Sequence, residues 1–159
     1  TRNRGTIGGA IASKTRSSDW NAALLALDAT IHTTKTSYMA EDYFCRGGLS
    51  EGELITKISF ELPSKGIYLK HTRTSSSDAI IGVLVSRLHK RCRVAVVGNE
   101  RVAFLCPALG AALSARFHPD VYDQSHIPAN MLSENRDASL DYQLNLVEIL
   151  CKRAIDRCA

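Results

Sequence analysis

The residues best suited to chemistry form a short glycine-containing segment near the start of the chain, Thr6-Ile7-Gly8-Gly9. Two adjacent glycines let the backbone turn sharply and approach a ligand without interference from a Cβ atom. Backbone amides in such a turn can point at phosphate oxygens, and a helix N-terminus nearby adds a favourable partial positive charge. The segment is compatible with a phosphate-binding turn, although a short glycine pair is more often an ordinary turn.

Two charged residues further along the chain are also candidates for contacts with a nucleotide. Asp19 could accept hydrogen bonds from ligand hydroxyls, and its alternative role is to cap the helix that starts there. Lys70, on a predicted strand with Tyr68, could neutralise a phosphate or could be a solvent-exposed strand lysine. The residues alone leave both roles open in each case.

Other kinds of catalytic site find little support in the sequence. The five cysteines form an odd set without a C-x-x-C pair, which argues against a zinc site, an iron–sulfur site and a disulfide framework. The five histidines are scattered without metal-binding spacing, and no G-x-S-x-G elbow is present. The glycine pattern Gly5-x-x-Gly8-Gly9 differs from the Rossmann fingerprint. We therefore expect reduced thiols in a cytoplasmic protein and no metal site.

Composition places the chain among globular domains. A length of 159 residues with 45% hydrophobic residues predicts one domain or two small ones with a real core. A net charge of +4 is too mild to argue for nucleic acid, and the longest apolar run, 79–85, is too short to span a bilayer. A phosphate-binding turn normally follows a strand, and the glycines lie too near the start for one. We expect the chain to be the C-terminal part of something longer.

The first part of the sequence predicts short helices and strands around these residues. Residues 1–18 are expected to be irregular, and a mobile loop is expected around 47–52, where Gly47, Gly48 and Gly52 cluster. The expected elements are a helix over 20–28, strands over 29–34 and 38–39, a helical turn over 40–44 and a strand over 53–62. A break at 63–66 is the candidate boundary between two domains, 1–63 and 64–159.

The second part predicts an antiparallel sheet with helices. The expected strands are 67–71, 79–88, 93–97 and 101–105, and short turns join the last three into a meander. A helix over 108–115 and an irregular stretch over 117–135 follow. A final helix begins at about Ser139 and has an apolar seam that consists of Leu140, Leu144, Val147, Cys151, Ala154 and Cys158. The fold class is α+β, with helices on one side of antiparallel strands.

Five segments in this order resemble the FAD-binding subunit of molybdenum hydroxylases. This family includes the medium subunit of carbon monoxide dehydrogenase and the flavin domain of xanthine dehydrogenase. The segments are Thr6–Gly9, Asp19–Ala29, Gly52–Thr56, Tyr68-x-Lys70 with Asp78-Ala79-Ile80, and Arg136–Tyr142. The resemblance implies the C-terminal half of an FAD-binding subdomain, followed by a domain like the C-terminal domain of that medium subunit, with a three-stranded antiparallel sheet packed with helices.

The resemblance also implies a cofactor and the residues that bind it. Electrons would leave a molybdenum centre, cross iron–sulfur clusters on a partner and pass through FAD to an external acceptor. By similarity, the pyrophosphate of FAD would lie on the glycine segment, Asp19 would contact the cofactor, Ile55 would lie against the isoalloxazine region and Lys70 would lie near the flavin. The implied cofactor-binding residues are Thr6, Ile7, Gly8, Gly9, Asp19, Ile55 and Lys70.

The same resemblance implies partners and leaves one alternative open. The molybdenum cofactor and the 2Fe–2S clusters would lie on separate molybdenum and iron–sulfur subunits, and the N-terminal half of the FAD domain would be missing from this chain. The family usually has Asn or Asp where this chain has Ala10. The alternative is therefore a non-catalytic remnant or subunit-interaction module that has lost the flavin.

Overall fold

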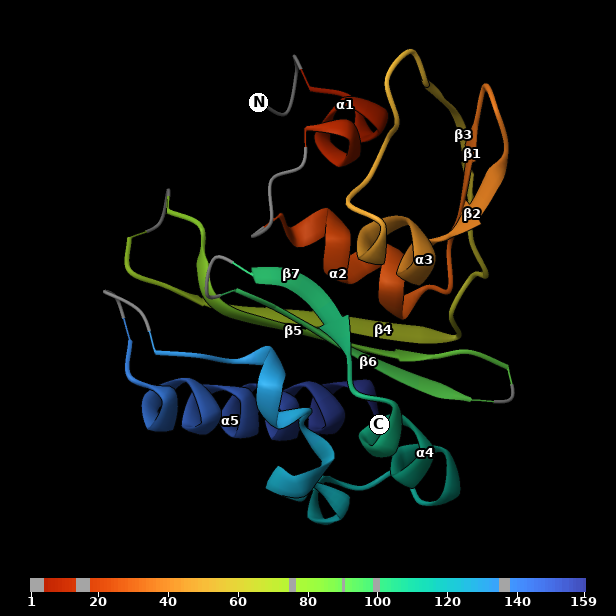
Figure 1. Cartoon of the computed structure of the whole chain (residues 1–159). Coiled ribbons are helices and arrows are strands. Elements are labelled where there is room, and N and C mark those ends of the chain that lie inside the picture. Colours follow the sequence, from red (N-terminus) through yellow and green to blue (C-terminus); the bar gives the residue numbers. More distant parts are fainter. Residues whose placement is uncertain (1–4, 14–17, 75–76, 90, 99–100, 135–137) are drawn as a thin grey trace.

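The computed structural model describes residues 5–13, 18–74, 77–89, 91–98, 101–134 and 138–159. Of the residues used above, Arg136 and Asp137 lie outside this part of the chain, as do residues 1–4, 14–17 and 135 of the stretches expected to be irregular. Figure 1 shows three layers, in which a central sheet separates the elements of the first part of the chain from the C-terminal helices. The α+β fold class is confirmed.

The central sheet is the predicted antiparallel meander with one more strand. Its order is β4-β5-β6-β7, and every neighbouring pair is antiparallel. The added strand β4 pairs along its whole length with β5, so the sheet has four strands instead of three. The bounds are β4 Lys65–Thr72, β5 Ala79–Arg87, β6 Cys92–Gly98 and β7 Arg101–Leu105.

Helices cover both sides of the central sheet, so the expectation of helices on one side only is wrong, and strand β6 is buried on both faces. Val94 and Val96 belong to the core on the side of the C-terminal helix, whereas Ala95 and Val97 belong to the core on the opposite side. Side chains alternate between the two faces of a strand, so consecutive apolar residues serve two separate cores. The helix α2, Asp19–Ala26, packs on the second of these faces.

The first part of the chain forms a smaller antiparallel sheet with short helices. The order of this sheet is β2-β1-β3. Residues 1–18 were expected to be irregular, and this prediction is wrong for a six-residue helix, α1, that spans Ile7–Ala12. The remaining elements are β1 Thr30–Thr33, β2 Ser37–Met39, α3 Ala40–Cys45 and β3 Ile55–Ser59.

The C-terminal helices cover the other face of the central sheet. The helix α4 spans Pro107–Ala115, and the stretch expected to be irregular contains three short 3-10 turns. The last helix, α5, spans Leu140–Cys158, and Ser139 caps it by accepting a hydrogen bond from the amide of Tyr142. The turns are η1 Pro119–Val121, η2 Gln124–His126 and η3 Ala129–Met131.

The predicted seam of α5 is too narrow. Leu140 is 38% exposed, whereas Leu146, Leu150 and Ile155 are buried although the seam omitted them. The helix packs against β4 and β5 of a broad sheet. A sheet covers a wider stripe of a helix than a single facing helix does, so the apolar face extends beyond a 4-3-4 repeat.

Candidate functional site

The glycine segment forms the first turn of α1 and is not a sharp turn. Thr6 is the N-cap in an extended conformation, and its Oγ1 accepts a hydrogen bond of 3.0 Å from the amide of Gly9. Gly8 and Gly9 lie inside the helix, and neither has the positive φ that requires glycine. The expected backbone turn is therefore wrong, because the hydroxyl of Thr6 starts a helix at this position.

The two glycines leave the space beside the helix start free of side chains. Among the described residues, no heavy atom would lie within 4 Å of a Cβ atom on Gly8, whereas a Cβ atom on Gly9 would lie 3.0 Å from the Oγ1 of Thr6. The first amides of a helix have no partner inside it, and Thr6 already accepts from Gly9. The amides of Ile7 and Gly8 are therefore the ones that face the helix end, beside open space.

Asp19 and Lys70, predicted separately, meet in the structure. Asp19 is the first residue of α2, where Ser18 is the N-cap residue without a side-chain cap. The carboxylate of Asp19 accepts hydrogen bonds from the hydroxyl of Tyr68, at 2.5 Å, and from the Nζ of Lys70, at 2.7 Å. The side chain of Asp19 is 42% exposed and that of Lys70 is 38% exposed, so the ion pair remains accessible to solvent.

A glycine on the neighbouring strand makes room for Tyr68. A Cβ atom on Gly82 would collide with the hydroxyl of Tyr68 and would lie 2.9 Å from a methyl group of Val97. Burial, followed by the hydrogen bond to Asp19 and its negative charge, raises the pKa of Tyr68, so its hydroxyl remains a donor. Sequence reasoning missed this contact, and an isolated glycine inside a strand was its only local signal.

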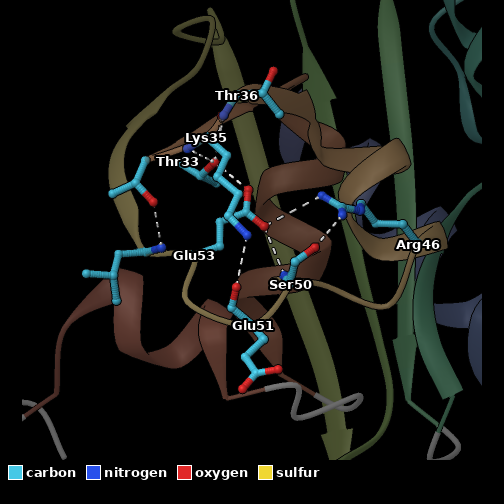
Figure 2. Close-up of polar contacts among 9 residues, drawn as sticks. Thr33, Lys35, Thr36, Arg46, Ser50, Glu51 and Glu53 are labelled. Carbon is cyan, nitrogen blue, oxygen red and sulfur yellow. Dashed lines mark hydrogen bonds and ion pairs between the residues drawn. The ribbon is translucent and has the colours of Figure 1, made fainter.

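The strongest polar centre that sequence reasoning missed is the buried carboxylate of Glu53, shown in Figure 2. The residue is 4% exposed and lies in the loop before β3. Its Oε1 accepts a hydrogen bond of 2.5 Å from the hydroxyl of Thr33, and its Oε2 accepts one of 2.9 Å from the amide of Ser50. The guanidinium of Arg46 lies 3.8 Å from the same Oε2. The expected mobile loop is therefore fastened at its centre.

The loop has further attachments around this carboxylate. The Nη2 of Arg46 donates to the Oγ of Ser50 at 2.8 Å, and the Nζ of Lys35 donates to the backbone carbonyl of Glu51 at 2.9 Å. The guanidinium of Arg46 also lies over the ring of Tyr38, 4.2 Å from its centre. These contacts join the end of α3, the loop and the β1–β2 hairpin (Figure 2).

Ile55 begins β3 directly after this centre and is partly buried. The helix α1 packs against both β3 and α2, so the glycine segment, the strand of Ile55 and the helix of Asp19 belong to neighbouring elements. The structure thus brings the elements of the predicted residues together. Asp19 and Lys70, which lie on different elements, form an ion pair, and Gly9 donates to Thr6 within α1.

A surface pocket of 310 Å³ lies elsewhere, between β6 and α4. Its lining includes Arg91 and Arg93, and each of these arginines is paired with the carboxylate of Asp28. None of the predicted cofactor-binding residues lines it. Arg91 also lies 3.8 Å from the carboxylate of Glu61, so two carboxylates balance the two arginines and the pocket offers no clear anion site.

Comparison with known families finds a similarity for the first part of the chain. Residues 1–64 match a family model described as the FAD binding domain in molybdopterin dehydrogenase. The predicted resemblance is confirmed. A search of curated proteins gave no match.

Solved structures share the fold along nearly the whole chain. One match is to quinoline 2-oxidoreductase from Pseudomonas putida 86, with a TM-score of 0.76 and 22% identity over 99% of this chain and 61% of that one. Another is to a carbon monoxide dehydrogenase from Hydrogenophaga pseudoflava, with a TM-score of 0.79 and 24% identity over 99% of this chain and 63% of that one. The chain thus has the fold of these chains and spans less than two thirds of their length.

Within the described ranges, no helix is long and apolar enough to cross a membrane, and no cluster of three or more potential metal ligands occurs. All five cysteines are free thiols. Burial raises the pKa of Cys106 to about 12, and burial also raises the pKa of Cys151. These thiols remain protonated and belong to the core, so they offer no nucleophile.

Proposed function

We propose that this chain forms part of the FAD-binding portion of a molybdenum-hydroxylase-type oxidoreductase. Electrons would pass from iron–sulfur clusters of a partner subunit through FAD to an external acceptor. The observation that carries this proposal is the match of residues 1–64 to the FAD-binding family model. The shared fold over 99% of the chain supports it.

The structure around Gly8 fits a phosphate group. The amides of Ile7 and Gly8 face the N-terminal end of α1, and no acidic residue lies in its first turn. The open space beside Gly8 would admit a phosphate oxygen close to the backbone. We therefore assign the pyrophosphate of FAD to Thr6, Ile7, Gly8 and Gly9, with Thr6 holding the helix start.

The paired Asp19 still has room for a ligand. A carboxylate offers about four acceptor positions, and the described partners Tyr68 and Lys70 use one on each oxygen. The exposed part of the side chain could accept a hydroxyl of the FAD chain while Lys70 neutralises the carboxylate. Ile55 would then supply the apolar contact with the isoalloxazine region. FAD would supply the redox chemistry, and this chain's residues would bind and orient it.

Partners follow from the same proposal. We assign the 2Fe–2S clusters and the molybdenum cofactor to separate subunits, and the rest of the FAD domain to sequence outside this chain. The division into domains 1–63 and 64–159 and a cytoplasmic location stay predictions. No role in binding nucleic acid is proposed.

The second candidate function is a fold retained without its flavin. Ala10 favours it, because this helical position of α1 has no polar side chain to offer the cofactor. The test is to purify the full-length gene product together with its partner subunits and to record its absorbance spectrum. A stoichiometric flavin band is the expected result, and a colourless, folded full-length product would support the remnant.

A further inference from the structure

We propose that Glu53 is a positioning residue that fixes the 46–54 loop against β1 and thereby sets the place of Ile55. We call the contacts of Glu53 with Thr33, Ser50 and Arg46 the clamp. The role of Ile55 at the flavin rests on the proposed function, whereas the clamp does not. Glu53 is a buried carboxylate that the cofactor assignment leaves unused.

The contacts of Glu53 come from three separate segments. Thr33 lies at the end of β1, Ser50 lies in the loop and Arg46 follows α3. The side chain of Glu53 is 0% exposed, and its two carboxylate oxygens receive the donors described above (Figure 2). A buried carboxylate is costly without such partners, so the loop can close over it only when all three segments are in place.

The hydroxyl of Thr33 has a single proton and two acceptors within reach. The carboxylate of Glu53 lies 2.5 Å away and the backbone carbonyl of Thr36 lies 2.8 Å away. Hydrogen bonds to an ionised acceptor are shorter and stronger than those to a neutral one, so the hydroxyl of Thr33 donates its proton to the hydrogen bond with the carboxylate of Glu53. The amides of Lys35 and Thr36 donate to the same hydroxyl oxygen, which fixes its orientation.

The same threonine connects the clamp to Ile55. Thr33 pairs with Ile55 across the sheet, while His32 pairs with Lys57, so β3 has one extra residue at this point. Such a bulge redirects the side chains beside it. Leu54 and Thr34 form two further hydrogen bonds. The amide of Leu54 donates to the Oγ1 of Thr34 at 3.2 Å, and the amide of Thr34 donates to the carbonyl of Leu54 at 2.9 Å. The direction of Ile55 therefore depends on a bulge that the Glu53–Thr33 contact holds in place.

The experiment compares Glu53→Gln with Glu51→Gln in the complete subunit. The control carries the same chemical change two residues away. The side chain of Glu51 is exposed, and the contact of this residue with Lys35 is made by its backbone carbonyl. Amide hydrogen exchange at Ser50 and Leu54 measures the clamp, and FAD affinity with the visible circular dichroism of the bound flavin measures the position of Ile55. A second pair, Thr33→Val and Thr33→Ser, removes or keeps the hydroxyl without changing charge.

We expect Glu53→Gln and Thr33→Val to accelerate exchange at Ser50, to weaken FAD binding on the order of tenfold and to alter the flavin spectrum. Glu51→Gln and Thr33→Ser should match the wild type. Unchanged exchange in both disruptive variants would overturn the clamp. Faster exchange with unchanged flavin signals would overturn the positioning of Ile55 and leave the proposed function intact. A wild-type subunit without flavin would instead refute the proposed function and, with it, the positioning role.

Discussion

At the scale of single residues, Gly8 and Gly9 are adjacent, and both lie in α1, yet a side chain would affect them differently. The Cβ position of Gly8 faces open space, whereas that of Gly9 faces the hydroxyl that caps the helix. A substitution at Gly9 therefore tests helix capping as well as ligand access. A substitution at Gly8 tests ligand access alone, because no described atom of the protein occupies the space that the new side chain would take.

Gly8→Val is expected to abolish flavin binding without destabilising the apo protein. Its branched side chain would occupy the space assigned to the pyrophosphate, so affinity for FAD should fall about 100-fold or more. Gly9→Val should also lower the melting temperature, because it crowds a cap that contributes about 1 kcal/mol. Flavin content and apo melting temperature should be measured for both variants. Full flavin occupancy in Gly8→Val would remove the glycine segment from the site.

Acid pH is expected to weaken the contribution of Glu53 to stability. The hydrogen bond from Thr33, followed by that from the amide of Ser50, lowers the pKa of Glu53 below its ordinary 4.5. Because the folded-state pKa is the lower one, the stabilisation is fully present above pH 4.5 and is lost as pH falls through the folded-state pKa. The groups that face Glu53 are Arg46, Tyr38 and Tyr43, and burial raises the pKa of Tyr43 above its ordinary value.

The measurement is the free energy of unfolding of the wild type and of Glu53→Gln from about pH 6 to pH 3. The advantage of the wild type should shrink toward the acid end, because glutamine does not titrate. A constant difference over the whole range would show that the charge of Glu53 does not stabilise the fold.

At the scale of elements, the contact between α2 and β4 depends on a third element, β5. Asp19 on α2 reaches Tyr68 and Lys70 on β4, and Tyr68 fits only because Gly82 on β5 lacks a side chain. Lys70 and Gly82 are direct partners in the β4–β5 ladder. The glycine thus lets a tyrosine lie across the sheet and hold the helix that carries Asp19.

Gly82→Ala is expected to destabilise the protein by about 1–3 kcal/mol, the usual cost of forcing an atom into a packed site. Part of this cost should disappear when Tyr68→Phe is added, because the hydroxyl is the nearest atom to the new methyl group, whereas the methyl group of Val97 remains 2.9 Å away. Unfolding free energies of the two single variants and the double variant give the coupling. Purely additive effects would mean that Tyr68 is not what requires glycine at this position.

At the scale of the whole molecule, the central sheet has a different core on each face. The face toward α5 includes Val83 and Val96, and the face toward α2 includes Ala95 and Val97. The first part of the chain, to which the FAD-binding model matches, therefore packs on the sheet of the second part. We therefore expect the chain to fold as one cooperative unit.

The isolated chain is expected to fold but to bind FAD weakly or not at all. The chain spans 61% and 63% of the two oxidoreductase chains whose fold it shares, so it would provide only one wall of the proposed site. Titration with FAD, followed by flavin fluorescence, measures the affinity, and circular dichroism checks the fold. Stoichiometric binding below about 1 μM would contradict the expectation of an incomplete site.

The sequence by itself determined the features that depend on neighbours along the chain. Strands β5, β6 and β7 follow from apolar runs joined by short turns, and α5 follows from its cap at Ser139 and its helical period. The family resemblance likewise rested on local segments, such as Thr6–Gly9, that keep their order. These signals need no knowledge of which distant segments meet.

Only the tertiary structure decided which polar groups are buried and which partners they have. Glu53 sits in an alternating pattern that looks like a strand, yet it is buried because Thr33, twenty residues earlier, supplies a hydroxyl. Asp19 resembled a helix cap, yet its partners Tyr68 and Lys70 lie 49 and 51 residues away. A polar side chain carries no local mark of its partner, because the free energy of its burial depends on donors that only folding brings into reach.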